Sequence, residues 1–153
     1  MKISIKSLAL ASVFLLLPAS VMAQSSDHEA VDQVMKKFMS AYTTADNAKA
    51  KEVFRKDGVM IGYSAARGSD LLMRTGEQFA EGFNGKPAAD EAKRKRSYEI
   101  VDMAENFAAV RVNLDYPGWR GVDYVVLLKN EGKWMIISKA WTGANSPPAR
   151  SRR

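Results

Sequence analysis

Cysteine is absent from the 153 residues, and histidine occurs only once, at His28. Without cysteine the chain can form no disulfide, no thiolate metal site and no cysteine nucleophile. A single histidine argues against a multi-histidine zinc or iron centre. The sequence also lacks a glycine-rich phosphate loop, a GxSxG nucleophile elbow and an HExxH helix. We therefore expect neither a metal nor a cofactor, and any chemistry would use carboxylate, phenol or amine groups.

The N-terminus has the composition of a secretory signal. Lys2 and Lys6 come before an apolar segment, residues 8–17, which is shorter than the roughly 20 residues needed to span a bilayer. Pro18 ends this segment, and Val21-Met22-Ala23 offers small residues at the positions that signal peptidase requires. We expect cleavage after Ala23, no stable membrane anchor afterwards, and export across the inner membrane to a bacterial periplasm.

The rest of the chain is expected to form one domain. We assign residues 1–23 to the signal peptide, residues 24–142 to the domain and residues 143–153 to a disordered basic tail. The formal charge of +6 falls to +4 without the two signal-peptide lysines. The tail is interpreted as solubilising, and the Lys-Arg-Lys-Arg run at 93–96 as a solvated strand edge. We therefore expect no nucleic-acid partner.

Three helix starts can be recognised from their capping residues. The first helix has apolar residues three and four apart from Ala30 to Tyr42, which is typical of an amphipathic helix. The second is short and is expected to end at the Asp57-Gly58 step. The capping patterns themselves are Ser26-Asp27-His28-Glu29, Asp46, and Thr75-Gly76-Glu77-Gln78.

The hydrophobic period changes from helical to two after residue 93. A first strand is predicted at Val59 to Tyr63, and four strand-like runs follow at 94–103, 107–116, 122–129 and 133–141. Helices followed by an antiparallel meander indicate an α+β fold. The last two runs are apolar on both faces, so we expect them to be central strands.

Two segments carry a resemblance to a known superfamily. The segment Phe54-Arg55-Lys56-Asp57-Gly58-Val59, after two helices, is similar to the opening of the nuclear-transport-factor-2-like superfamily. The residues from Asp123 to Lys139, with Gly132-Lys133-Trp134 at the turn, resemble its putative lumazine-binding branch. The resemblance implies a cone-shaped, strongly curved antiparallel sheet packed against three N-terminal helices, with a pocket at the open end. It also implies a homodimer that pairs through the outer sheet face.

Asp123 and Lys139 are the leading site candidates. A three-residue turn with a bulge at Gly132 would place Asp123 opposite Lys139, on one face with Met135, Ile137 and Trp141. Asp123 would then be a general base or an anchor for ligand donors. A two-residue Glu131-Gly132 turn would change the register and separate the pair. An ordinary cross-strand ion pair is the alternative.

Other candidates lie around the expected mouth of the cone. Tyr63 ends the first strand, Arg67 lies in the Ala65 to Ser69 loop that follows it, and Trp119 lies in the Pro117 to Gly121 turn. Trp119 could stack on a flat ligand or simply cover the core. Tyrosines in the strands fit a cavity or a half-buried structural role equally well; these are Tyr98, Tyr116 and Tyr124.

Three functions are compatible with these residues. We favour an exported, non-catalytic module that binds an unknown small molecule through Tyr63, Arg67, Trp119, Asp123, Lys139 and Trp141. The second hypothesis is a cofactor-independent isomerase, dehydratase or cyclase that uses Asp123 with a tyrosine. The third is a dimerisation scaffold, which a cavity filled by Trp141 and Met135 would indicate. Enzymes of the superfamily often use a histidine with an aspartate, whereas His28 is expected to be solvated.

Overall fold

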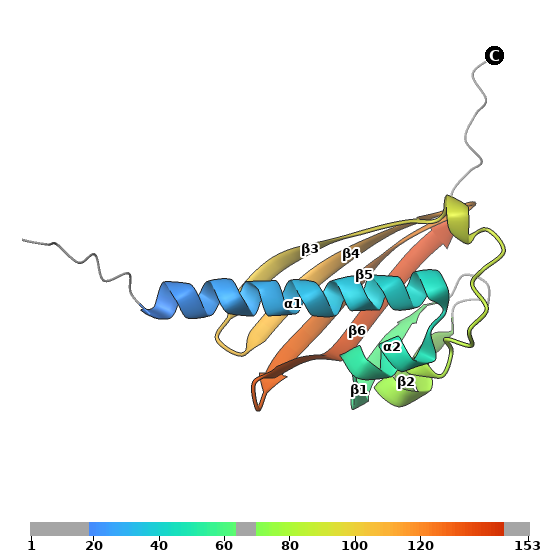
Figure 1. The fold of residues 1–153 in the computed structure, drawn as a ribbon. Helices are drawn as coiled ribbons and strands as arrows, with labels where there is room; N and C mark the ends of the chain where they lie inside the picture. The colour runs from blue at the N-terminus through green and yellow to red at the C-terminus, as the bar shows by residue number, and fades with distance from the viewer. Residues whose placement is uncertain (1–18, 64–69, 146–153) are drawn as a thin grey trace, which may run out of the picture.

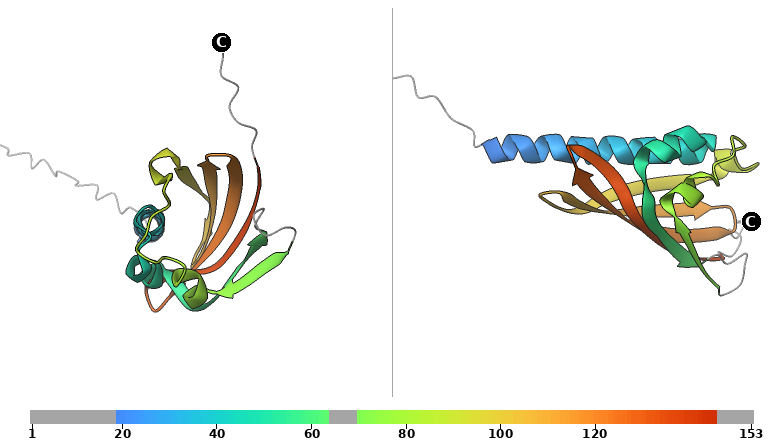
Figure 2. Two further views of the ribbon diagram at one scale, coloured as in Figure 1. Left: turned by 90° about the vertical axis from the view of Figure 1, so that its right-hand side faces the viewer. Right: turned by 90° about the horizontal axis from the view of Figure 1, so that it is seen from below.

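A six-stranded curved sheet with a long helix across its concave side forms the body of the protein (Figures 1 and 2). The computed structural model describes residues 19–63 and 70–145. Its elements are α1 (Ala19–Thr44), α2 (Asn47–Val53), β1 (Phe54–Tyr63), β2 (Leu71–Thr75), α3 (Gly76–Ala80), the 3₁₀ turn η2 (Glu91–Lys93), β3 (Lys95–Ala104), β4 (Phe107–Tyr116), β5 (Trp119–Asn130) and β6 (Lys133–Asn145).

The sheet order is β2-β1-β6-β5-β4-β3. The meander from β3 to β6 is antiparallel as predicted, and the α+β cone is confirmed. The sheet is mixed rather than purely antiparallel, because β1 pairs with β6 in the parallel direction. Sequence patterns predict neighbours along the chain, and this contact joins strands that are far apart in sequence. The edge strand β2, between Leu71 and Thr75, was not predicted.

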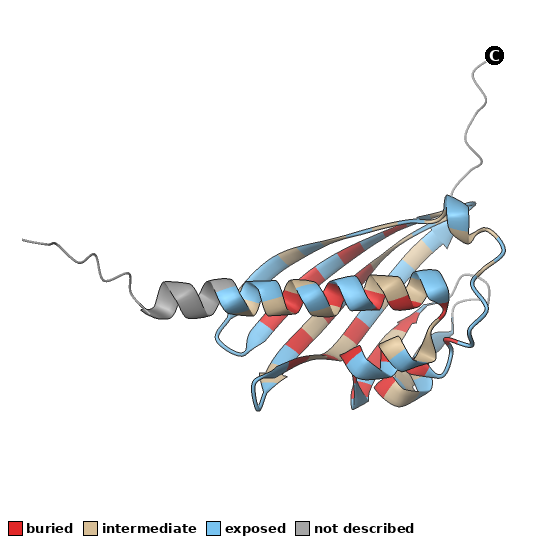
Figure 3. Ribbon diagram, viewed as in Figure 1, coloured by how far each residue is buried: buried red, intermediate tan, exposed pale blue. Residues whose placement is uncertain are grey.

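The helix α1 buries the stripe that its spacing predicts. Val31, Met35, Phe38 and Ala41 are fully buried against the sheet, and buried positions alternate along the facing strands (Figure 3). The prediction that Ser26 caps the start of the first helix is wrong, because α1 begins at Ala19. Only helix-compatible residues separate Ala19 from Ser26, so no signal in that stretch interrupts the helix.

The second and third helices begin where their caps predict. The Asp46 side chain accepts a hydrogen bond from the Lys49 backbone N–H at 3.1 Å. At α3, Thr75 and Gln78 form the reciprocal capping box. The predicted end of the second helix at Asp57-Gly58 is wrong, since α2 ends at Val53 and β1 begins at Phe54.

The step at Asp57-Gly58 instead lies where β1 departs from regular pairing with β6, between Phe54 and Val59. A Cβ on Gly58 would lie 2.8 Å from the Ile137 carbonyl oxygen. Only glycine permits this close approach of the two backbones.

The β5–β6 hairpin has a two-residue turn and one bulge. Asn130 pairs with Lys133, and Glu131 and Gly132 have positive φ values of 51° and 77°, as a tight hairpin turn requires. Further along, Leu127 pairs with Ile136 but Val126 pairs with Ser138, so Ile137 is an extra residue in β6. This bulge shifts every later pair in the hairpin by one residue.

The hairpin register corrects one expectation about the core. Trp134 and Ile136 are buried on the inner face, whereas Met135 and Ile137 line a hollow on the outside of the hairpin. Met135 was predicted on the core face from a three-residue turn. The shorter turn reverses the alternation in the first half of β6.

Candidate functional site

A cavity of about 690 Å³ lies at the open end of the cone. It brings together five of the six predicted ligand-binding residues, and the sixth, Arg67, lies outside the described residues. Side chains come from α1, α3 and five strands, so the curvature of the sheet creates the cavity. The lining residues are Tyr42, Tyr63, Leu72, Arg74, Phe79, Arg94, Leu114, Tyr116, Pro117, Gly118, Trp119, Asp123, Lys139, Trp141 and Asn145.

Asp123 and Lys139 form a buried ion pair in the cavity wall. Lys139 Nζ lies 3.1 Å from Asp123 Oδ2, and the two side chains are 3% and 0% exposed. The contact is electrostatic rather than an aligned hydrogen bond, and neither Asp123 oxygen has a hydrogen-bond partner among the described residues. A buried carboxylate normally accepts hydrogen bonds, so Asp123 retains unused acceptor capacity.

The register predicted for this pair was incorrect, although the contact itself exists. Asp123 pairs with Trp141 across the strands, and Val125 pairs with Lys139. The two-residue turn alone would have put Asp123 and Lys139 on opposite faces. The extra residue Ile137 restores Lys139 to the inner face, diagonal to Asp123.

Burial acts against both charges of the pair. It raises the pKa of Asp123 above the ordinary value of 3.8, against the attraction of the Lys139 charge. It lowers the pKa of Lys139 from 10.5, against the opposing effect of Asp123. Lys139 also lies over two rings, 4.3 Å from the Trp141 centroid and 5.0 Å from that of Phe79. The aromatic faces therefore partly replace the water that the ammonium has lost.

Glycines allow the two cavity tryptophans to lie against the sheet. A Cβ on Gly62 would lie 2.3 Å from the ring-fusion carbon Cδ2 of Trp141, so this indole covers the Gly62 backbone. The paired residues Gly121 and Gly143 lie beneath Trp119, and a Cβ on either would be 2.0 Å from the ring. Glycine inside a strand is destabilising by roughly 0.5–1 kcal/mol relative to alanine. These positions therefore indicate a requirement for close approach.

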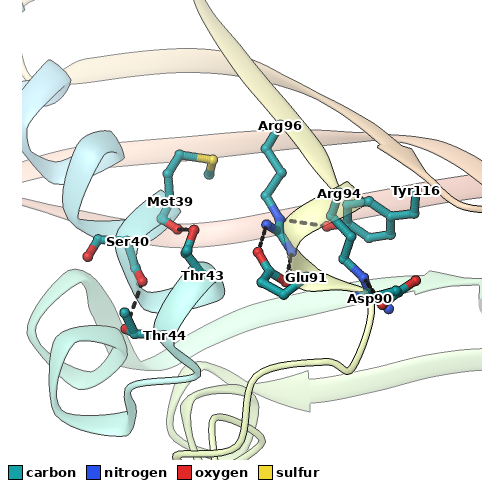
Figure 4. A network of polar contacts seen from close by, with 9 residues as sticks. All are labelled: Met39, Ser40, Thr43, Thr44, Asp90, Glu91, Arg94, Arg96 and Tyr116. Carbon is teal, nitrogen blue, oxygen red and sulfur yellow. Dashed lines mark hydrogen bonds and ion pairs between the residues drawn. The ribbon is translucent and has the colours of Figure 1, made fainter.

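A second polar cluster holds the aromatic rim in place (Figure 4). Arg96 forms a two-pronged ion pair with Glu91, and its Nε donates to the Tyr116 hydroxyl at 2.8 Å. Its guanidinium also lies over the rings of Tyr42 and Tyr116. Arg94 stacks on Tyr116 and pairs with Asp90 at 2.8 Å. This cluster joins η2 to β3, β4 and the end of α1.

Sequence reasoning missed this role for the basic run at 93–96. Lys93 ends η2 and Lys95 begins the edge strand β3, and both are exposed. The interpretation as a solvated strand edge is wrong for Arg94 and Arg96, which are half-buried and paired with acidic residues. The nearby acidic residues, Asp90 and Glu91, were the available signal. Burial raises the pKa of the Tyr42 and Tyr116 phenols, and the charge of Asp123 contributes in the same direction.

The other candidate tyrosines have structural positions. Tyr98 donates to the Asp32 carboxylate on α1 at 2.6 Å. Tyr124 is 55% exposed on the outer face. His28 is exposed on α1 and does not line the cavity. Among the described residues, no cluster of three or more His, Asp or Glu could hold a metal ion. No described helix is long and apolar enough to cross a membrane.

A larger hollow, of about 970 Å³, lies outside the β5–β6 hairpin. Several of its charged groups pair within the protein, among them Arg55 with Asp57 at 2.5 Å and Lys129 with Asp27 at 2.7 Å. It contains no buried carboxylate without a hydrogen bond. The smaller cavity is therefore the candidate site, since its wall has the buried polar group that the larger hollow lacks.

Solved structures with a similar fold show the class of proteins to which this chain is similar. A protein of unknown function from Silicibacter pomeroyi, described as NTF-2 like, matches with a TM-score of 0.65 at 20% identity, over 79% of this chain and 98% of the other. An NTF2-like protein of unknown function from Shewanella baltica matches with a TM-score of 0.64 at 21% identity, over 80% of this chain and 97% of the other. A cystatin-like fold protein from Burkholderia xenovorans matches with a TM-score of 0.60 at 14% identity, over 78% of this chain and 92% of the other. The chain thus has the NTF2-like fold.

A family model described as "Putative lumazine-binding" matches residues 26–142. The match covers most of the chain, so the protein belongs to this family, as its hairpin residues predicted. No curated protein matches the sequence.

The ion pair generates a stability prediction. We expect Lys139→Met to lower the free energy of unfolding by about 3–5 kcal/mol at pH 7, because Asp123 is left buried without a countercharge. Burial raises the folded pKa of Asp123, so the loss should be smallest below pH 3.8 and should increase as the pH rises through the folded pKa. Urea denaturation at several pH values measures this dependence.

The matched control is the double variant Asp123→Leu/Lys139→Met. Replacing both charges with apolar groups should recover most of the lost stability, because neither partner is then left unpaired. A Lys139→Met protein as stable as the wild type at pH 7 would contradict the buried-pair interpretation.

Proposed function

We propose that this protein binds a small organic molecule in the cavity at the open end of the cone, without catalysing its conversion. The observation that carries the proposal is Asp123, a fully buried carboxylate in the cavity wall with no hydrogen-bond partner among the described residues. Leaving such acceptors unmatched is unfavourable. A ligand N–H or O–H group would satisfy them, and the charge of Lys139 favours the ionised carboxylate that accepts most strongly.

The rest of the cavity suits a flat ligand. Trp119, Trp141 and Phe79 line it, and the glycine contacts fix the two indoles against the sheet. Its volume lies in the range of about 300–1,000 Å³ that is usual for small-molecule sites. The family description supports the same class, since lumazine is a planar heteroaromatic molecule with ring N–H donors.

A scaffold function without a ligand is less favoured. That hypothesis required Trp141 and Met135 to fill the cone. Trp141 lies along the wall of an open cavity, and Met135 is on the outside of the sheet.

Ligand retention tests the role of Asp123. The wild-type protein, isolated from the periplasm and analysed by native mass spectrometry, should carry a copurified small molecule. Asp123→Asn should lose it, because the amide presents its N–H group where the ligand donor would bind. Asp102→Asn, an exposed position on β3, is the matched control and should retain the molecule. Unchanged retention in Asp123→Asn would remove Asp123 as the anchor.

An acid–base enzyme is the second candidate. It is supported by two phenols, Tyr42 and Tyr116, that line the same cavity as Asp123. An aspartate base and a tyrosine acid would suit an isomerase or lyase reaction. The pairing of Asp123 with Lys139 favours binding instead, because the lysine stabilises the unprotonated carboxylate and weakens it as a base. Incubation of the copurified compound with fresh protein separates the two functions: an enzyme changes its chromatographic retention, and a binding protein returns it unaltered.

We further propose that two copies pair through the outer face of the sheet. A shallow hollow of about 290 Å³ on that face is lined mainly by apolar residues of β1, β2, β5 and β6. Leu71, Met73 and Tyr124 are 53%, 67% and 55% exposed there, an apolar grouping that is typical of interaction surfaces.

The dimer is tested by a charge placed on this face. Tyr124→Glu should shift the protein from dimer to monomer mass in light scattering, since two buried glutamates would face each other across the interface. Thr43→Glu, on the exposed end of α1, is the control and should remain dimeric. A wild-type protein that is monomeric at tens of micromolar would contradict the proposal.

We also propose that the protein is exported and cleaved after Ala23. The n-region lysines, the short apolar segment and the Val21-Met22-Ala23 site support this. Intact-mass measurement of protein from the periplasmic fraction should give a chain that begins at Gln24. A periplasmic chain that still carries residues 1–23 would contradict cleavage.

A further inference from the structure

The charges that line the cavity do not balance. Arg74, Arg94 and Lys139 are cationic, and Asp123 is the sole carboxylate among the lining residues. Two of the cations are matched within the protein, since Lys139 pairs with Asp123 and Arg94 pairs with Asp90. Arg74 forms no ion pair and no hydrogen bond with any described residue. The cavity therefore contains one uncompensated positive charge.

The position of Arg74 is set by the pairing of β2 with β1. Arg74 lies opposite Met60, whose side chain is completely buried on the inner face. The alternation along β2 then separates two apolar outer residues, Leu71 and Met73, from the inner pair Leu72 and Arg74. An arginine at an inward position, without an acidic partner, is uncommon in a protein that pairs its other cavity cations.

The aromatic wall adds a second requirement. On the inner face of the hairpin the successive pairs are Asp123–Trp141, Gly121–Gly143 and Trp119–Asn145. The indole of Trp119 lies across the glycine pair, on the side of its own backbone nearer to Asp123. A flat surface thus adjoins the buried carboxylate, within a cavity that also contains the unpaired guanidinium.

We propose that the cavity selects a planar organic anion: its ring packs against Trp119, a ring N–H or O–H group donates to Asp123, and its carboxylate or sulfonate group binds Arg74. This inference rests on the proposed binding function and specifies the ligand class. The three groups act on different parts of the ligand, which fixes its orientation. The guanidinium suits an oxyanion because its donors can bind two oxygens at once.

Two fluorescent probes that share one skeleton test the charge preference. Anilinonaphthalene sulfonate has an aromatic skeleton, an N–H donor and a negative charge, and phenylnaphthylamine has the same skeleton without the sulfonate. The wild-type protein should bind the sulfonate at least about tenfold more tightly than the neutral probe. Raising the ionic strength should lower the affinity for the sulfonate probe only, since salt screens the charged contact.

Variants assign the preference to Arg74. Arg74→Gln should lower the affinity for the sulfonate probe about tenfold and leave the affinity for the neutral probe unchanged. Arg74→Lys should retain part of the affinity for the sulfonate probe. Arg111→Gln, an exposed arginine on β4 outside the cavity, is the matched control and should bind both probes normally. Trp119→Ala should weaken both probes, which places them in the cavity. Circular dichroism and urea midpoints verify that each variant is folded.

Three results would overturn the inference. If the neutral probe binds as tightly as the sulfonate in a Trp119-dependent manner, the cavity binds flat molecules without selecting an anion, and the proposed binding function stands. If Arg74→Gln lowers the affinity for both probes equally, Arg74 maintains the shape of the cavity wall and does not bind the anionic group. Probe binding that Trp119→Ala does not affect lies outside the cavity and counts against this ligand class altogether.

Discussion

The buried contact between Asp123 and Lys139 depends on the register of one hairpin. A tight turn at Glu131-Gly132 starts the pairing, and the extra residue Ile137 shifts it so that Lys139 returns to the inner face. Without the bulge, the ammonium would point away from the cavity and Asp123 would be a buried charge without a partner, which is strongly unfavourable. The same shift places Trp141 opposite Asp123. The polar and aromatic parts of the site therefore share a single geometric cause.

The cavity exists because the core occupies only part of the cone. The middle of α1 fills the concave face with Val31, Met35 and Phe38, which pack against the central strands. Towards the open end the inward residues become polar or aromatic, and Arg96 locks Tyr42 and Tyr116 together there. The protein is thus filled by its core at one end of the sheet and open at the other. A site that is already shaped in the free protein loses less conformational entropy on binding.

Much of this structure could be predicted from local patterns. Local signals, each spanning only a few residues, predict the helix caps at Asp46 and Thr75 and the four C-terminal strands. The register could not be predicted, since the run Trp134 to Ile137 is apolar on both faces and its periodicity cannot identify the inner one. The parallel contact of β1 with β6 and the unpaired state of Arg74 depend on distant segments. The candidate cavity was nevertheless recognised, because its residues are polar or aromatic interruptions in apolar strands.

The glycines beneath the indoles constrain the order in which this sequence can change. A side chain at Gly121 or Gly143 collides with Trp119, so neither glycine can be replaced while the tryptophan remains in place. The reverse order is open at Gly121, because a smaller residue at position 119 frees the space above it. At Gly143 a Cβ would still lie 2.7 Å from the Arg120 carbonyl oxygen. Mutational effects at the three positions are therefore coupled and directional. Descendants that reshape this wall from β5 must first lose the tryptophan, and only then can position 121 acquire a side chain.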